Sequence, residues 1–185
     1  TQTSASAQPK IVDSGSLITE NSKPTIKFDG TSDKLFSVIQ YTPTTSMAQI
    51  IVAKGDSAST DQIIGDNNDR KNGMSLRIQN SNFNYFNGTG AAFNSLTHTA
   101  NSNQNLHFYG RDTSSSFYAR LNSSEVSTSI SAISTTDLNI FLAARHDSSL
   151  FLDGNIQEYI LYLTSQSSNK TAIEDNINSH YNIYT

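Results

Sequence analysis

The side chains that could carry acid–base chemistry in this sequence are few and widely separated. Glycoside hydrolysis needs two carboxyl groups that face each other across the scissile bond. Asp66 and Asp69 are three residues apart in an expected loop, which is the wrong spacing for one face of a strand. None of the four glutamates has an acidic neighbour two residues away: Glu20, Glu125, Glu158 and Glu174. The sequence therefore predicts no catalytic carboxylate pair.

Other catalytic chemistries lack their signatures as well. The chain has no cysteine, which excludes disulfides, thiolate catalysis and cysteine-based zinc sites. It has no G-x-S-x-G nucleophile elbow and no P-loop. Its histidines are far apart in the sequence, and His107 alternates with Leu106 and Phe108, as a structural or solvent-facing residue of a strand would. We predict that the chain is not an enzyme.

Residues 55–69 carry the ligand types that calcium prefers. Asp56, Asp66 and Asp69 supply carboxylates among glycines and asparagines in an expected long loop. The segment does not follow the EF-hand pattern, because Arg70 stands where an oxygen ligand should be. The alternative is a solvated cluster of turns, in which Asp, Asn and Gly meet backbone requirements.

Two segments combine aromatic rings with planar polar groups, as sugar-binding sites do. The amide of asparagine both donates and accepts hydrogen bonds, which suits sugar hydroxyl groups. In residues 82–87, however, Phe83 and Tyr85 lie on one face of the expected strand and Phe86 lies on the other. At least one of these two faces must point into the core. The candidate sugar contacts are Asn82, Asn84, Tyr85, Tyr109, Arg111 and Asp112.

The elements that must position these residues are short strands separated by polar turns. Met74-Ser75-Leu76-Arg77-Ile78 alternates apolar and polar residues, whereas residues 47–53 are almost continuously apolar, as in a strand covered on both faces. About ten or eleven such runs precede residue 165. Ile173, Ile177 and Tyr181 then form one stripe of a short helix. Thr171 to Glu174 matches a capping box, and Ser168 or Asn169 could cap the helix equally well. We predict an all-β, two-sheet antiparallel jelly-roll sandwich with a short C-terminal helix.

Composition limits the partners of the chain. Charged residues make up 15% of its 185 residues, the formal net charge is −4, and no basic cluster is present, so nucleic-acid binding is not expected. No apolar run is long enough to span a membrane. Residues 1–9 are polar and are predicted to be a leader or linker cut from a longer protein, with one domain over residues 10–185.

Both ends of the domain resemble a known superfamily. Three segments resemble laminin-G-like, or concanavalin A-like, lectin/glucanase domains. They are Phe28-Asp29-Gly30, the stretch FLDGNIQEYILYL over residues 151–163, and the SQSSNKTAIEDNINSHYNIY tail. The variant is similar to copies in phage and other viral virion proteins and in marine bacterial surface proteins. The resemblance covers roughly residues 10–40 and 138–185. It is carried by Phe151, Gly154, Ile156, Glu158, Ile160 and Tyr162, with Tyr181, Ile183 and Tyr184 at the close.

The resemblance implies how the ends meet and where a catalytic site would lie. The first and last strands of such sandwiches are neighbours, so residues 26–28 would lie beside residues 156–162. Members that hydrolyse β-glucans carry E-x-D-x-E on one strand, which this sequence lacks. Calcium is common in the superfamily at the rim of the sandwich, so calcium is the one cofactor that the resemblance suggests.

Three residues of the opening and closing segments are given structural roles. Gly30 and Gly154 are expected to permit turns, with Asp153 at the preceding turn position. Glu158 is expected to share a strand face with Ile156 and to be held by backbone N–H groups, Arg145 or Lys27, because an unpaired buried charge is costly. Replacement of Glu158 by glutamine is therefore expected to lower stability and to leave glycan binding intact.

The functional hypothesis is a non-catalytic adhesion module on a virion or a cell surface, of the tail-fibre, tail-spike or capsid-decoration type. Such a module would bind host glycans weakly, and multivalent display, including oligomers formed through a parent protein, would supply the strength. The alternatives are a carbohydrate-binding module of a secreted bacterial enzyme, and a purely structural domain that contacts other virion or surface subunits.

Overall fold

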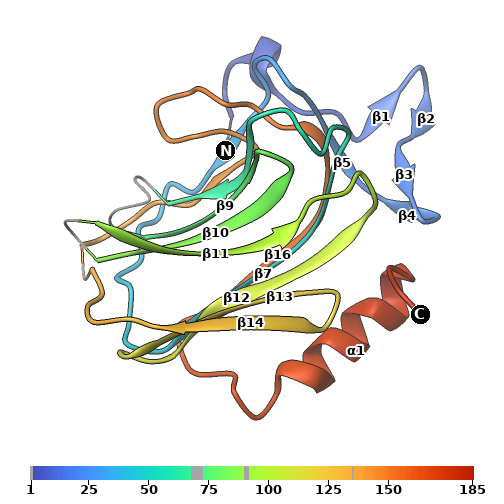
Figure 1. The fold of residues 1–185 in the computed structure, drawn as a ribbon. Helices are drawn as coiled ribbons and strands as arrows, with labels where there is room; N and C mark the ends of the chain where they lie inside the picture. Colours follow the sequence, from blue (N-terminus) through green and yellow to red (C-terminus); the bar gives the residue numbers. More distant parts are fainter. Residues whose placement is uncertain (1, 68–72, 90–91, 135) are drawn as a thin grey trace.

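The computed structural model describes residues 2–67, 73–89, 92–134 and 136–185. Two six-stranded sheets pack face to face as an antiparallel jelly-roll sandwich, with one helix at the C-terminus (Figure 1), which confirms the predicted fold class. The helix-bearing sheet has the order β14-β13-β12-β7-β16-β5, and the opposite sheet has the order β11-β10-β9-β8-β15-β6. No helix of the described residues has the length and apolar content that crossing a membrane requires.

The bounds of the elements follow. The helix-bearing sheet contains β5 (Ile26–Asp29), β7 (Met47–Gly55), β12 (Asn105–Thr113), β13 (Ser116–Leu121), β14 (Ser124–Ser129) and β16 (Asp153–Tyr162). The opposite sheet contains β6 (Leu35–Phe36), β8 (Gln62–Asp66), β9 (Met74–Gln79), β10 (Asn82–Gly88), β11 (Phe93–Thr99) and β15 (Phe141–Leu142). The remaining elements are η1 (Ala5–Ala7), β1 (Val12–Asp13), β2 (Ser16–Leu17), β3 (Thr19–Glu20), β4 (Lys23–Pro24) and α1 (Lys170–Tyr181).

Strand β7 lies at the centre of the molecule and is covered on both faces, as its apolar run predicts. Met47, Ile51 and Ala53 belong to the core between the sheets. Ile50 and Val52, from the alternate positions, lie in a second apolar cluster beneath the helix. Because side chains alternate along a strand, a strand with two apolar faces needs a covering layer on each side.

Helix α1 supplies the covering layer on the outer face of the helix-bearing sheet (Figure 1). Ile173, Ile177 and Tyr181 pack into the second cluster, so the predicted stripe is confirmed. The N-cap is Asn169, one of the two predicted alternatives to Thr171, and its side chain makes no capping hydrogen bond. The predicted capping box is wrong, because Glu174 turns inward to pair with Arg120 at 2.7 Å.

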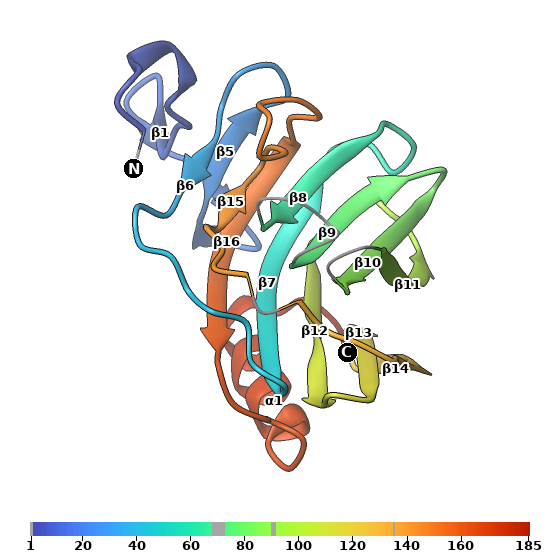
Figure 2. The same cartoon turned by 90° about the vertical axis from the view of Figure 1, so that its left-hand side faces the viewer.

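The first and last strands of the sandwich lie side by side, as expected. Strand β5 pairs with β16, with Ile26 opposite Ile156, and β16 pairs on its other side with β7 (Figure 2). Gly30 has a φ of +73° and occupies the predicted turn. Gly154 instead lies within β16, where a Cβ atom would be 2.0 Å from the carbonyl oxygen of Lys54. Close approach of the β7 backbone, not a turn, requires glycine there.

A β-bulge in β16 decides which way Glu158 points. The pairing of β16 with β7 shifts between Ile156 and Glu158, so that Ile156 opposes Ala53 and Glu158 opposes Val52. Ile156 lies in the core between the sheets, whereas Glu158 lies on the outer face beside α1. The predicted common face for these two residues is therefore wrong, because one extra residue in a strand reverses the alternation.

The N-terminal residues fold back on the sandwich through the hairpins β1–β2 and β3–β4. Gln157, the bulge residue, donates from Nε2 to the carbonyl oxygens of Glu20, Lys23 and Pro24, at 3.0 to 3.2 Å. The Lys34 backbone N–H donates to the carbonyl oxygen of Ala7 at 3.4 Å. The division of the chain at residue 9 stays a prediction.

Candidate functional site

Three of the predicted sugar contacts lie inside the sandwich. Tyr85 and Tyr109 have no exposed surface, and Arg111 is 2% exposed. Strand alternation places the odd residues of β10 and β12 between the sheets, where no ligand reaches them. These three assignments are therefore corrected.

The buried polar groups of this core hold one another. The Tyr109 hydroxyl donates to Gln49 Oε1 at 2.9 Å, and the Tyr85 hydroxyl is 2.8 Å from His107 Nδ1. Burial lowers the pKa of His107 to about 3, which keeps the imidazole neutral. Burial also lowers the pKa of Arg111 to about 10, while Tyr41 raises it. These hydrogen bonds lie within the core, away from any surface that a ligand could contact.

The other three predicted sugar contacts are not brought together. Asn82 and Asn84 are half-buried on β10. Their amides donate to the carbonyl oxygens of Asn80, in the adjoining turn, and of Gln79, at the end of β9. Asp112 lies in β12 and accepts from Nζ of Lys170, the first residue of α1, at 2.9 Å. Their role in sugar binding stays a prediction.

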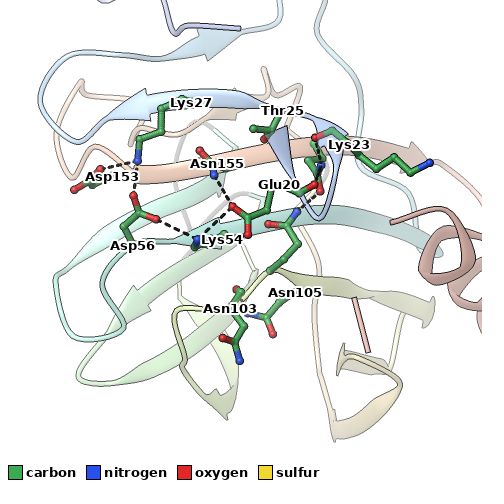
Figure 3. A network of polar contacts seen from close by, with 12 residues as sticks. Glu20, Lys23, Thr25, Lys27, Lys54, Asp56, Asn103, Asn105, Asp153 and Asn155 are labelled. Carbon is green, nitrogen blue, oxygen red and sulfur yellow. Dashed lines mark hydrogen bonds and ion pairs between the residues drawn. The ribbon is translucent and has the colours of Figure 1, made fainter. Parts of the chain in front are cut away.

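The calcium candidates are also separated. Asp56 accepts from Lys27 and lies 3.9 Å from Lys54 Nζ, in a network that includes Asp153 and Glu20 (Figure 3). Lys27 and Lys54 thus already balance the negative charge of the Asp56 carboxylate. In the described ranges, no group of three or more His, Asp or Glu side chains is placed to hold a metal ion.

Asp66, the second calcium candidate, is 3% exposed at the end of β8, and His146 donates to it through its backbone N–H at 3.1 Å. Its expected position in a loop is wrong, because residues 62–66 form a strand buried along its whole length. Asp69, the third candidate, lies outside the described residues.

A groove lies between β16 and α1. Its volume is about 600 Å³. Strand β16 contributes Glu158, Ile160 and Tyr162, which alternate outward after the bulge. Helix α1 contributes residues three and four apart on one face: Ile173, Asn176, Ile177, His180 and Tyr181.

The groove has an apolar floor and a polar rim. Ile160, Ile173 and Ile177 belong to the second apolar cluster and form its base. Asn176 and His180 are exposed on the helix. Asn169, at the other end, donates from Nδ2 to the buried Gln166 Oε1 at 3.1 Å. The arrangement offers aliphatic and aromatic surface next to hydrogen-bonding groups.

Glu158 is the carboxylate of this groove. Among the described residues, no hydrogen bond or ion pair reaches its side chain. The predicted partners are wrong, because Lys27 pairs with Asp56 and Asp153, and Arg145 pairs with Asp147 at 3.5 Å. Burial raises the pKa of the Glu158 carboxyl, and the charge of His180 lowers it to a smaller extent. A carboxylate that is half-buried and without a protein partner remains free to accept hydrogen bonds from a ligand.

The raised pKa predicts how Glu158 affects stability. A carboxyl whose pKa is higher in the folded than in the unfolded state binds more protons when folded. The free energy of unfolding therefore falls as the pH rises from the ordinary value of 4.5 through the raised pKa. We expect Glu158→Gln to remove this loss and to be at least as stable as the parent protein at pH 7. Urea unfolding at pH 4.5, 5.5 and 7 measures the difference, and a less stable variant at pH 7 would restore a structural role for Glu158.

Comparisons with known proteins support the fold. No family model and no curated protein sequence matches the chain. The botulinum neurotoxin serotype D binding domain has a similar structure, with a TM-score of 0.64 and 13% identity over 95% of this chain and 46% of that chain. The serotype D ligand binding domain in complex with N-acetylneuraminic acid gives a TM-score of 0.60 and 14% identity, over 85% and 42% of the two chains.

A third similar structure comes from botulinum neurotoxin type C, whose cell entry is described as dependent upon interaction with two ganglioside molecules. Its TM-score is 0.62 and its identity is 10%, over 84% of this chain and 41% of that chain. This chain therefore spans less than half the length of these structures. At such low identities the likeness establishes a shared β-sandwich fold.

Proposed function

We propose that this chain is a non-catalytic carbohydrate-binding module and that its ligand lies in the groove between β16 and α1. One observation carries the proposal. The groove joins an apolar floor and two tyrosines to a carboxylate that accepts no hydrogen bond from any described residue. A sugar ring presents apolar C–H groups on its faces and hydroxyl groups around its edge. The apolar floor of the groove complements the C–H groups, and the carboxylate complements the hydroxyl groups.

Four of the lining side chains have a stated role in that proposal. The rings of Tyr162 and Tyr181 pack against the apolar face of a sugar, as amphipathic aromatic groups do. The Glu158 carboxylate accepts hydrogen bonds from hydroxyl groups, which makes charge-assisted bonds. The Asn176 amide both donates and accepts. A single carboxylate in the groove supports binding and not hydrolysis, because hydrolysis needs a pair.

The structural neighbours support carbohydrates in general as the ligand class, and they do not specify the charge of the sugar. Their descriptions name N-acetylneuraminic acid and gangliosides as molecules that those proteins bind or depend on. The sequence resemblance to laminin-G-like and concanavalin A-like domains supports the same class. We propose a place on a virion or cell surface for the module, where repeated copies raise the overall affinity by about 10² to 10⁴.

A second candidate function is contact with another protein subunit. Val38 and Ile39, which follow β6 at the edge of the opposite sheet, are 71% and 78% exposed. Exposed apolar side chains at a sheet edge favour protein contacts. Such a domain would show no sugar-dependent change in any titration.

The test is a glycan array probed with a tetramer of the domain, followed by titration of the monomer with each hit. We expect Asn176→Ala to weaken binding by about two- to tenfold, because one hydrogen bond contributes about 0.5–1.5 kcal/mol. The helix should stay intact, since alanine favours helices. Ser179→Ala, on an exposed position of the same helix outside the groove, is the matched control.

Two results would contradict the proposal. An array without any signal, including the glycans of the natural host, would argue against glycan binding. Equal weakening by Asn176→Ala and Ser179→Ala would place the ligand away from the groove.

A further inference from the structure

We infer that the groove between β16 and α1 selects uncharged glycans and rejects glycans built from acidic sugars. This inference rests on the proposed function and names the class of ligand for the same site. It follows from the charges that line the groove and from the ion pairs that the surrounding cations already make with protein carboxylates.

The charge inside the groove has one sign. Glu158 is its carboxylate, and none of its lining residues is a lysine or arginine. His180 is exposed on the rim of the groove. An acidic sugar would therefore bring a second negative charge beside Glu158 without a fixed cation to offset it.

The cations that flank α1 are already engaged. Arg120 donates to Glu174 and to Glu125, at 2.7 and 3.0 Å. Lys170 Nζ is 2.9 Å from the Asp112 carboxylate and lies 3.4 Å from the centre of the Tyr118 ring. Moving either cation to an acidic ligand would leave a carboxylate unpaired, and for Glu174 that carboxylate is buried.

The backbone of the helix adds to the same preference. Glu158, His180 and Tyr181 meet near the C-terminal end of α1, and the C-cap residue Asn182 has a left-handed backbone. The C-terminal end of a helix carries a partial negative charge from its free carbonyl groups. Anionic ligands are therefore disfavoured at this end, whereas hydroxyl groups, which donate hydrogen bonds, are accommodated.

The experiment compares two ligands that differ only in charge. Oligogalacturonate and its carboxyl-reduced form share one backbone, and the reduction replaces each carboxylate by an uncharged hydroxymethyl group. Both are titrated into the ¹⁵N-labelled protein at pH 8. We expect the reduced oligomer to shift signals of α1 and β16 and to bind at least about tenfold more tightly than the acidic one.

The variants assign the preference to Glu158. In Glu158→Gln we expect the two ligands to bind within about threefold of each other, because the fixed charge is gone. Asp175→Asn removes an exposed carboxylate of the same helix that does not line the groove, and it should keep the preference of the parent protein.

The possible failures are distinguishable. Equal or tighter binding of the acidic oligomer, or an unchanged preference in Glu158→Gln, overturns the inference and leaves glycan binding in place. Absence of any shift with both oligomers and with every neutral glycan selected on the array overturns the proposed function itself.

Discussion

Replacing Gly154 by alanine should lower the free energy of unfolding by about 3 kcal/mol or more. The added Cβ atom would lie 2.0 Å from the Lys54 carbonyl oxygen and 3.0 Å from the Gly55 Cα atom. Both are backbone atoms of the central strand β7, so neither can rotate away as a side chain would. Relief of the overlap requires β7 and β16 to separate, which breaks the longest ladder of the helix-bearing sheet.

Urea unfolding followed by circular dichroism measures this effect, and Gly15→Ala is the control. Gly15 has nothing within 4 Å of the position of its Cβ atom, but its φ of +80° disfavours alanine. We expect Gly15→Ala to cost about 1 kcal/mol. If both variants lose the same stability, then close backbone approach does not explain why position 154 requires glycine.

Replacing Arg120 by methionine should lower the free energy of unfolding by about 3–5 kcal/mol. Arg120 Nε lies 3.0 Å from both carboxylate oxygens of Glu174, and Nη2 lies 2.7 Å from one of them. Glu174 is 1% exposed, so the substitution leaves a buried charge without its partner. The hydrogen bonds to Glu174 also raise the pKa of Arg120 above its ordinary value.

The loss should be concentrated in α1, because this ion pair joins the helix to β13. Hydrogen exchange of α1 amides is expected to accelerate before that of β7 and β12 amides. Glu125→Gln, which removes a partly exposed partner of Arg120, should cost less than about 1 kcal/mol.

The double variant Arg120→Met with Glu174→Leu tests the mechanism of the loss. Because it removes both charges, it should recover much of the stability that Arg120→Met loses. A double variant as unstable as Arg120→Met would show that the loss does not come from an unpaired Glu174.

Local periodicity predicts those strands and helix faces whose side chains meet one continuous apolar surface. The alternation of Met74, Leu76 and Ile78 correctly places one face of β9 in the core. The stripe of Ile173, Ile177 and Tyr181 likewise gives the packed face of α1. Strand β11 is not predicted, because residues 93–99 are mostly polar and lie at the edge of a sheet, where little apolar surface is buried.

The candidate site is predicted only in part. Periodicity identifies Glu158, Ile160 and Tyr162 as neighbours on one strand face, and Ile177 and Tyr181 as neighbours on the helix. It gives no information on which strand face the helix covers or on the gap that remains between them. Aromatic residues flanked by asparagine draw attention to Tyr85 and Tyr109, whose strands turn both rings inward.

The sequence by itself determines the all-β class and the C-terminal helix, and the resemblance of its two ends to a known superfamily implies the neighbouring positions of the first and last strands. These features depend on the spacing of apolar residues and on motifs at the two ends, which are local properties of the chain. The tertiary structure decides the direction of Glu158, the reason for glycine at position 154 and the partner of Glu174. Each of these depends on an inserted bulge or on a contact between distant segments, and the register between such segments is set only when the layers pack.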